Sequence, residues 1–317
     1  MTVHDPLLTR LERSGLAGSG VVGRLLDEAG LVQHGCRVGA APHASHLNVS
    51  GAPLQLCLSA RCDDVEASEA RLLVDPFVGL APSRRAAHAM ALAGAGRSGS
   101  AWMAALPRFG QVPAAGSLWI GWCLSRDGAL LYAPWKLGAA VYLNAELFGP
   151  APWHAILAFL DRILPPSPDR ARLLAAPAEG CRPVSVALEL KDEVPQRIKL
   201  YLRGPAPALA RFTAALDPEG DLSLLTDIVQ PKAGWPAQGV TLALGFDCKS
   251  GAPKGVKLDL CLCERCRAVA EVAPGLEQRV QARIPVAASL DGVARLALLG
   301  AGAGGKGARL NAYFEPY

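Results

Sequence analysis

A repeated pattern constrains the fold of this chain more than any other feature of its sequence. Each repeat begins with a stretch of helical periodicity and continues with two strand-like runs in which apolar and polar residues alternate. The helix-like stretches cover 7–30, 83–106, 152–175, 206–229 and 265–292. Five such cycles recur at roughly 50–65 residues, a period typical of internal repeats. The chain is therefore predicted to consist of five ααββ units.

The ten strand-like runs favour a closed sheet. Short turns join the two members of each pair, so each pair is expected to form an antiparallel hairpin. An open sheet of ten strands would leave unpaired edges, and closure into a barrel removes them. We predict an α+β fold in a single domain over 1–317, a ten-stranded antiparallel β-barrel surrounded by helices. The runs are 53–61, 69–75, 117–125, 139–146, 184–191, 197–203, 240–247, 256–263, 293–300 and 308–314.

The alternation within the runs decides which face of the barrel wall points inward. One face is aliphatic, as in Ile198, Leu200 and Leu202, and the other face carries the polar side chains. If the polar face pointed to solvent, the amphipathic helices would have no apolar surface to cover. We therefore expect the aliphatic face under the helices and a wide lumen lined by polar groups. In the alternative, an apolar-cored barrel, the cations of the polar face would be solvated surface residues.

Composition excludes several classes of function. Of the 317 residues, 51% are hydrophobic and 19% are charged, which is typical of a globular chain. The net charge of +4 is too small for general binding to nucleic acid or membranes. The first residues contain no apolar signal segment, no run reaches the ~18 apolar residues of a membrane span, and an odd count of nine cysteines favours free thiols. We expect a cytoplasmic monomer without nucleic-acid or membrane partners.

Cationic and phenolic side chains would converge in the predicted lumen. The cations come from different hairpins and are Arg71, Arg197, Lys199, Lys257 and Arg309. Burying them together requires a compensating anion, and arginine and lysine both suit phosphate oxygens. Three of the five tyrosines, Tyr142, Tyr201 and Tyr313, share this face, and their rings can stabilise a nearby cation. An anion site beside an aromatic cage suits a reaction that separates a diphosphate from a carbocation.

The short motifs on these strands resemble those of the ABBA aromatic prenyltransferases. They are Arg-x-Lys-x-Tyr in "RIKLY" (197–201), Lys-x-Asp in "KLD" (257–259) and Arg-x-Asn-x-Tyr in "RLNAY" (309–313). The chain length, Arg71 on the second strand and a chain that ends on the tenth strand look most like the cyanobactin-type peptide prenyltransferases. The resemblance implies a prenyltransferase barrel (PT barrel) that moves dimethylallyl, or a longer prenyl group, from its diphosphate to a nucleophile on a peptide or an aromatic natural product.

The resemblance also implies roles for individual residues. The five lumen cations would hold the prenyl diphosphate, the expected co-substrate. Tyr201 and Tyr313, with Tyr142, would shield the allylic cation from water. No residue is predicted to hold a metal, although Mg²⁺ could accompany the two phosphates. The acceptor pocket would contain Gln55, Asn311 and Trp119.

This sequence departs from the family pattern at three positions. Ala140 stands where relatives often carry a lysine, and Asp259 stands where a tyrosine is common. Gln55 stands where a carboxylate often contacts the acceptor, so an indole or phenol acceptor does not carry over directly. Glu189 and Asp259 share the lumen face and are candidates for the general base or the acceptor anchor. Two carboxylates would also suit a cationic acceptor such as a guanidinium.

Other functions stay open at the level of sequence. A non-catalytic barrel that binds an anionic or isoprenoid ligand would have the same lining. "GAGAGGKG" (300–307) is close to the phosphate-binding pattern G-x-x-x-x-G-K-[ST] of nucleotide enzymes, but Gly307 replaces the hydroxyl residue and a strand is predicted to follow it. "CLCERC" (261–266) and "PHASH" (42–46) are weak metal-binding patterns, and buried thiols and a loop are expected there instead.

Overall fold

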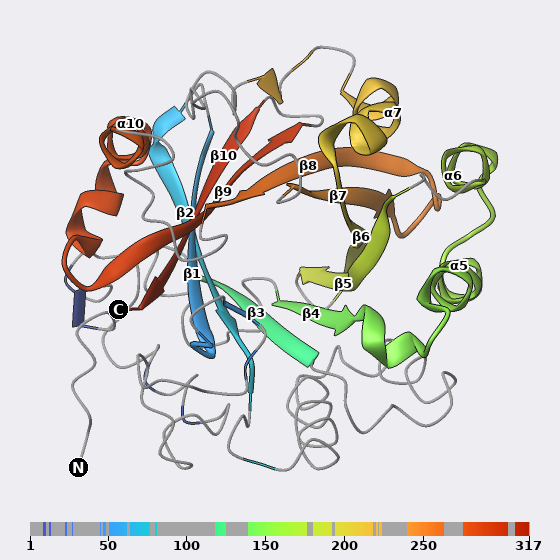
Figure 1. Cartoon of the computed structure of the whole chain (residues 1–317), viewed down its shortest axis with the longest axis horizontal. Coiled ribbons are helices and arrows are strands. Elements are labelled where there is room, and N and C mark those ends of the chain that lie inside the picture. Colours follow the sequence, from blue (N-terminus) through green and yellow to red (C-terminus); the bar gives the residue numbers. More distant parts are fainter. Residues whose placement is uncertain are drawn as a thin grey trace.

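The computed structural model contains a closed β-barrel (Figure 1). Its ten strands close in the order β1-β10-β9-β8-β7-β6-β5-β4-β3-β2, and every neighbouring pair is antiparallel. The predicted α+β class with a ten-stranded antiparallel barrel is therefore confirmed. The structure describes residues 9, 10, 13, 23, 27, 45, 47, 48, 51–61, 64–76, 80, 118–124, 139–175, 180–191, 194–217, 220, 222, 223, 240–262, 275–303 and 308–316.

The ten strands fall on the ten predicted runs, with ends that differ by up to five residues. The bounds are β1 Leu54–Arg61, β2 Asp64–Val74, β3 Leu118–Leu124, β4 Ala139–Asn144, β5 Arg182–Lys191, β6 Val194–Gly204, β7 Val240–Asp247, β8 Pro253–Cys261, β9 Ala294–Ala303 and β10 Arg309–Pro316.

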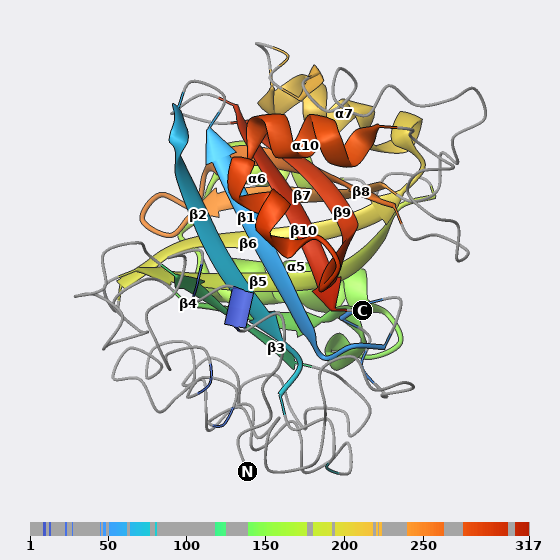
Figure 2. The same cartoon turned by 90° about the vertical axis from the view of Figure 1, so that its left-hand side faces the viewer.

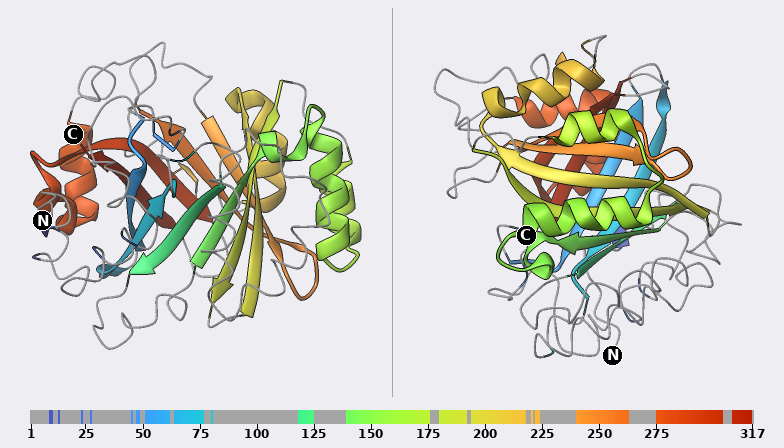
Figure 3. Two further views of the ribbon diagram at one scale, coloured as in Figure 1. Left: turned by 90° about the horizontal axis from the view of Figure 1, so that it is seen from below. Right: turned by 90° about the vertical axis from the view of Figure 1, so that its right-hand side faces the viewer.

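Helices cover the outside of the barrel wall (Figures 2 and 3). Those within the described residues are α5 Pro152–Ile163, α6 Pro168–Leu174, α7 Ala206–Leu216 and α10 Leu276–Arg283, with 3-10 turns η4 Ala145–Phe148 and η6 Pro285–Leu290. The order α5, α6, β5, β6 forms one complete ααββ unit of the predicted kind. The helical stretches predicted over 7–30 and 83–106 lie almost entirely outside the described residues, and a single domain over the whole chain stays a prediction.

The main hydrophobic core lies between the outer face of the barrel and these helices. Ile156, Phe159 and Leu160 of α5 are fully buried in it, together with the aliphatic strand residues such as Leu200 and Phe246. The second apolar cluster is small and lies inside the barrel. Burial of aliphatic side chains is the main favourable term in folding, so the outer face of the wall holds this fold together. The predicted inside-out arrangement is confirmed.

Prolines explain where the predicted helices end. The predicted helix over 152–175 is divided into α5 and α6 by Pro165 and Pro166, and the hydroxyl of Ser167 accepts a hydrogen bond from the backbone N–H of Arg170 at the start of α6. Pro285 ends α10 in the same way, and η6 follows. No helix within the described residues is long and apolar enough to cross a membrane.

Candidate functional site

A cavity of about 220 Å³ lies inside the barrel, close to the turns that join the strands of each hairpin. Asn311 and Tyr313 line it, and the structure brings all five predicted phosphate-binding cations together around it. Arg61, the last residue of β1, adds a sixth cation. The cationic lining is Arg61, Arg71, Arg197, Lys199, Lys257 and Arg309.

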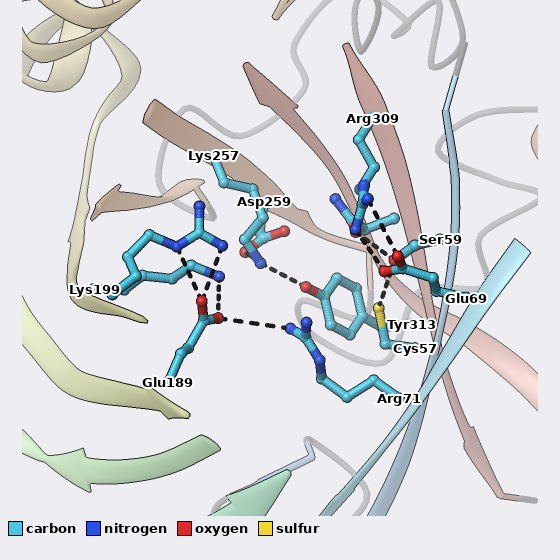
Figure 4. A network of polar contacts seen from close by, with 12 residues as sticks. Cys57, Ser59, Glu69, Arg71, Glu189, Lys199, Lys257, Asp259, Arg309 and Tyr313 are labelled. Atoms are coloured by element: carbon cyan, nitrogen blue, oxygen red, sulfur yellow. Dashed lines mark hydrogen bonds and ion pairs between the residues drawn. The ribbon is translucent and has the colours of Figure 1, made fainter. Parts of the chain in front are cut away.

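Glu189 of β5 joins three of these cations into one ionic cluster (Figure 4). Its carboxylate accepts hydrogen bonds from Nε of Arg197 at 2.9 Å and from Nζ of Lys199 at 2.5 Å, and Nη1 of Arg71 lies 4.0 Å away. The antiparallel register pairs Glu189 directly with Arg197 of β6, and Lys199 follows two residues later on the same face. The hairpin therefore places one carboxylate between two cations.

Burial and charge act in opposite directions in this cluster. Burial alone would raise the pKa of the Glu189 carboxyl, but Lys199, Arg197 and Arg71 hold it well below its usual value of 4.5. Burial lowers the pKa of Lys199 from 10.5 to about 7, because the attraction of Glu189 does not offset desolvation and the repulsion of Arg197 and Arg71. Glu189 is therefore an anion at neutral pH, and the charge of Lys199 responds to changes near neutral pH.

Lys257 of β8 lies where the cations meet the tyrosines. Its ammonium contacts Oδ2 of Asp259 at 2.5 Å and donates to the hydroxyl of Tyr313 at 2.5 Å. It also lies 4.9 Å from the ring centroid of Tyr313 and 5.6 Å from that of Tyr201. One side chain thus contacts both the polar and the aromatic part of the lumen.

The three predicted shield tyrosines belong to one apolar cluster inside the barrel. The ring of Tyr142 lies 6.0 Å from that of Tyr201 and 6.5 Å from that of Trp119, centroid to centroid. Burial raises the pKa of all three phenols above 10, so they stay neutral. The other members and neighbours of this cluster are Cys57, Leu73, Ala187, Ala243, Leu47, Val184 and Leu298.

The cationic cavity carries an excess of positive charge. Among the described side chains, three carboxylates pair with its six cations: Glu189 with the cluster above, Asp259 with Lys257, and Glu69 with Arg309 at 2.6 Å. Three positive charges are left over when Lys199 is protonated. Concentrated positive charge in a partly closed lumen attracts a multivalent anion, and a diphosphate has the matching charge and oxygen geometry.

A short segment before β1 contacts the opposite end of the barrel. The hydroxyl of Ser45 donates to the carboxylate of Asp75 at 2.9 Å, and the amide of Gln55 donates to Oδ1 of Asn48 at 2.9 Å. Between them, Leu47 packs against the aromatic cluster of the lumen. Asp75 and Gln55 are almost completely buried. This end is thus covered by the chain, whereas the cations lie near the hairpin turns.

The predicted acceptor residues do not line one cavity within the described part of the chain. Asn311 lines the cationic cavity and accepts a hydrogen bond from Ser59 at 2.7 Å. Trp119 lies in the aromatic cluster, and Gln55 is bonded to Asn48 at the covered end. Neither of the last two lines the cationic cavity.

Sequence reasoning missed several polar residues of the lumen. Arg61 ends β1 and Glu69 lies at the start of the predicted run 69–75, inside β2, and extending the alternation by one more step from Ser59 and Arg71 would have found them. Glu315 is fully buried near the end of β10 and accepts a hydrogen bond from Nε of Arg295 at 2.6 Å. An isolated Glu near a chain end carried no signal of this kind.

The alternative motifs receive little support. Residues 304–307 of the glycine-rich turn lie outside the described residues, but β10 follows from Arg309, so a strand stands where the nucleotide-binding pattern requires a helix. Cys263, Cys266, His43 and His46 also lie outside the described residues. Within the described part of the chain, no group of three metal-ligating side chains is present.

The closed ten-stranded antiparallel barrel clad by helices has the fold of a PT barrel. No family model and no curated protein matches the sequence. The structure is similar to 5-dimethylallyl tryptophan synthase from Streptomyces coelicolor in complex with DMASPP and Trp, with 20% identity, a TM-score of 0.73 and coverage of 98% of this chain and 93% of that one. It is also similar to 6-dimethylallyltryptophan synthase from Micromonospora olivasterospora in complex with DMASPP and Trp, with 17% identity, a TM-score of 0.66 and coverage of 99% and 97%.

A third similar structure is the prenyltransferase PriB in its ternary complex with L-tryptophan and dimethylallyl thiolodiphosphate, with 18% identity, a TM-score of 0.65 and coverage of 98% and 94%. The similarity extends over nearly the full length of all three structures, so the whole architecture is shared. At this level of identity the shared property is the fold, that of the solved prenyltransferases.

Proposed function

We propose that this protein is a prenyltransferase that moves a dimethylallyl or longer prenyl group from its diphosphate to an acceptor held in the barrel lumen. The observation that carries the proposal is that, among the described side chains, six cations line the cavity beside the Tyr313 ring and three carboxylates pair with them. Lys199 and Lys257 are nearly buried and the arginines are partly exposed, and concentrated positive charge in such a partly closed lumen attracts an anion.

The reaction is an alkyl transfer with a diphosphate leaving group. The bond between the allylic carbon and the diphosphate oxygen breaks, and the electron pair leaves with the diphosphate. The lumen cations stabilise that developing charge. Tyr142, Tyr201 and Tyr313 would face the allylic cation and exclude water, which would otherwise add to it. The acceptor then supplies the electron pair of the new bond and loses a proton.

An aromatic acceptor fits the lumen best. Trp119, Tyr142 and Tyr201 form a chain of aromatic contacts beside the cationic cavity, and such rings pack favourably on another aromatic group. The similar structures named above hold Trp or L-tryptophan. The peptide acceptor predicted from the resemblance to cyanobactin-type enzymes stays a prediction, which the same assay tests.

Each of the two carboxylates predicted for the lumen has an oxygen paired with a cation. Glu189 and Asp259 were predicted as the general base or acceptor anchor, and these roles stay predictions. Because Glu189 holds Arg71, Arg197 and Lys199 in one cluster, we propose that it fixes the positions of the phosphate-binding cations. No carboxylate is among the described residues that line the cationic cavity, so this lining does not fit a protein-held Mg²⁺.

Product formation tests the proposal. The purified full chain is incubated with dimethylallyl diphosphate and, separately, L-tryptophan, tyrosine and tryptophan-containing peptides, with and without Mg²⁺, and the products are analysed by mass spectrometry. A gain of one prenyl unit that disappears in Arg197→Ala supports the transferase. Saturable diphosphate binding without product would support the non-catalytic barrel instead, and the absence of binding would contradict both.

A further inference from the structure

The contacts of Asp259 point to a role beyond acceptor binding. Asp259 and Lys257 are two residues apart on β8, and both side chains face the lumen, where Nζ of Lys257 contacts Oδ2 of Asp259 at 2.5 Å. The residue is only 5% exposed. Its other oxygen, Oδ1, is buried and has no hydrogen-bond partner among the described residues. Asp259 does not line the cationic cavity, whereas Lys257 does.

A glycine on the neighbouring strand makes room for this carboxylate. Gly300 of β9 is the register partner of Asp259, and a Cβ atom at Gly300 would lie 2.0 Å from Oδ1 and 3.1 Å from Cγ of Asp259. Real Cβ contacts are never this short, so any larger residue would displace the carboxylate. Gly302, the register partner of Lys257, differs, because a Cβ there would meet nothing closer than 3.8 Å.

Asp259 offsets the positive charge of Lys257, which would otherwise oppose the proposed reaction. The ammonium lies 4.9 Å from the Tyr313 ring and 5.6 Å from the Tyr201 ring, the two rings proposed to stabilise the allylic cation. A bare ammonium at this place would repel that cation. Paired with Asp259, the group is close to neutral overall, yet its third N–H is still available to a diphosphate oxygen.

We propose that Asp259 and Gly300 form a positioning unit that holds Lys257 between the diphosphate and the tyrosines and cancels its charge toward the allylic cation. This inference rests on the proposed transfer reaction. Lys257 contacts the leaving group, Asp259 acts through Lys257, and Gly300 provides the space for Asp259. The unit would let Lys257 bind the diphosphate without repelling the allylic cation that forms beside the tyrosines.

The first test uses the isosteric variant Asp259→Asn, which removes the charge and keeps the shape. Titration with inorganic diphosphate should show tighter binding, because Lys257 loses its internal counter-ion. The value of kcat with dimethylallyl diphosphate and the preferred acceptor should fall by roughly ten- to hundredfold, the effect of one uncompensated charge at this range. Loss of kcat with unchanged or weaker diphosphate binding would contradict the proposal, and would indicate a general base or a structural role.

Asp247→Asn is a matched control for this variant. Asp247 pairs with Lys254 at 2.7 Å on the same β7–β8 hairpin, so the substitution removes the carboxylate partner of a lysine outside the cationic cavity. Diphosphate affinity and kcat should both stay at the wild-type values. A shift equal to that of Asp259→Asn would mean that general electrostatics of the hairpin, and not the positioning of Lys257, explains the result.

The second test is a double-mutant cycle on Asp259 and Gly300. Gly300→Ala should reproduce the opposite changes in diphosphate affinity and kcat that we expect for Asp259→Asn, because the new methyl group displaces the carboxylate. In the Asp259→Ala background the same substitution should change little, apart from a modest loss of thermal stability from the contact with the Leu258 carbonyl at 3.1 Å. Equal effects of Gly300→Ala in both backgrounds would overturn the proposal. Gly302→Ala is the packing control and should leave the melting temperature unchanged.

The outcomes separate this inference from the proposed function. If the wild-type protein transfers no prenyl group, the proposed function fails. The titrations with inorganic diphosphate then test the positioning unit by themselves. The unit would be supported by tighter diphosphate binding in Asp259→Asn and in Gly300→Ala, provided that adding Gly300→Ala to Asp259→Ala tightens binding no further. Independent or absent effects would reject it even in an active enzyme.

Discussion

The two faces of β6 show how the barrel wall divides its tasks. Ile198, Leu200 and Leu202 point outward into the main core and are fully buried. Lys199 and Tyr201, their neighbours in the chain, point inward to the lumen, and Lys199 holds a charge that its surroundings disfavour. The outer face lowers the free energy of the folded state, whereas the inner face carries buried polar and charged groups that reduce stability and that we propose bind the diphosphate. Substitutions on alternate residues of one strand should therefore have effects of different kinds.

The largest effect is expected for Leu200→Ala on the outer face. Removing a fully buried leucine side chain leaves a cavity against the covering helices and should lower the free energy of unfolding by about 2–5 kcal/mol. Urea unfolding measures this change. Diphosphate affinity of the folded protein should stay the same, and a large loss of affinity would show that the two faces do not act separately.

Lys199→Met on the inner face should have a smaller effect, and that effect should be on catalysis and not on stability. The variant loses a charge-assisted contact with the diphosphate, which is typically about 1.5–3 kcal/mol, so kcat/KM for the donor should fall roughly ten- to hundredfold. Stability should change little or increase, because Met removes the cost of burying an ammonium and Glu189 keeps Arg197 and Arg71. A strongly destabilised variant would contradict the comparison.

The difference between the faces also explains which features were predictable from the sequence. Alternation is strict on the outer face, since any polar residue there would be buried in the core. The positions of the ten strands could therefore be predicted from it. The cations at Arg71, Arg197 and Lys199 could be assigned to one lumen because the same alternation fixes the inner face. Closure of the barrel then brought them together without further information.

Contacts between distant segments could not be read from the sequence. The fit between Asp259 and Gly300 depends on the register of β8 against β9. A shift of this register by two residues in either direction would preserve the alternation, so the sequence does not fix it. The contact of Leu47 with the aromatic cluster depends on the path of a segment before β1 that has no periodicity. The pairing of Glu189 with three cations depends on register and on barrel closure together, so its partners could be assigned only from the structure.

The pH dependence of donor binding tests the comparison of the two faces of β6 through a smaller effect. Burial lowers the pKa of Lys199 to about 7, so its ammonium is half present near pH 7 and is lost as the pH rises further. Donor affinity should fall above pH 7 by up to about tenfold per pH unit. Stability should change in the opposite direction and rise between pH 7 and the usual lysine pKa of 10.5, because the unfolded chain binds the additional proton there.

Lys199→Arg is the control for this pH effect. Arginine stays protonated over the whole range, so the variant should lose the component of the pH profile that belongs to Lys199 and keep any component that comes from the diphosphate itself. Isothermal titration with inorganic diphosphate from pH 6 to 9 gives both profiles. Identical profiles for wild type and variant would assign the dependence to another group.

The smallest effect is expected for Glu69→Gln at the edge of the lumen. Glu69 pairs with Arg309 at 2.6 Å, but its side chain is 55% exposed, whereas that of Glu189 is 14% exposed. Exposed ion pairs contribute between zero and about 1 kcal/mol, so stability should hardly change. Diphosphate binding should tighten by no more than about threefold, and this gain should disappear in high salt, which screens exposed charges. The effect of Glu189→Gln on diphosphate binding should depend less on salt, since the Glu189 side chain is the more buried of the two carboxylates. If both variants respond equally to salt, the greater burial of Glu189 does not protect its ion pairs from screening.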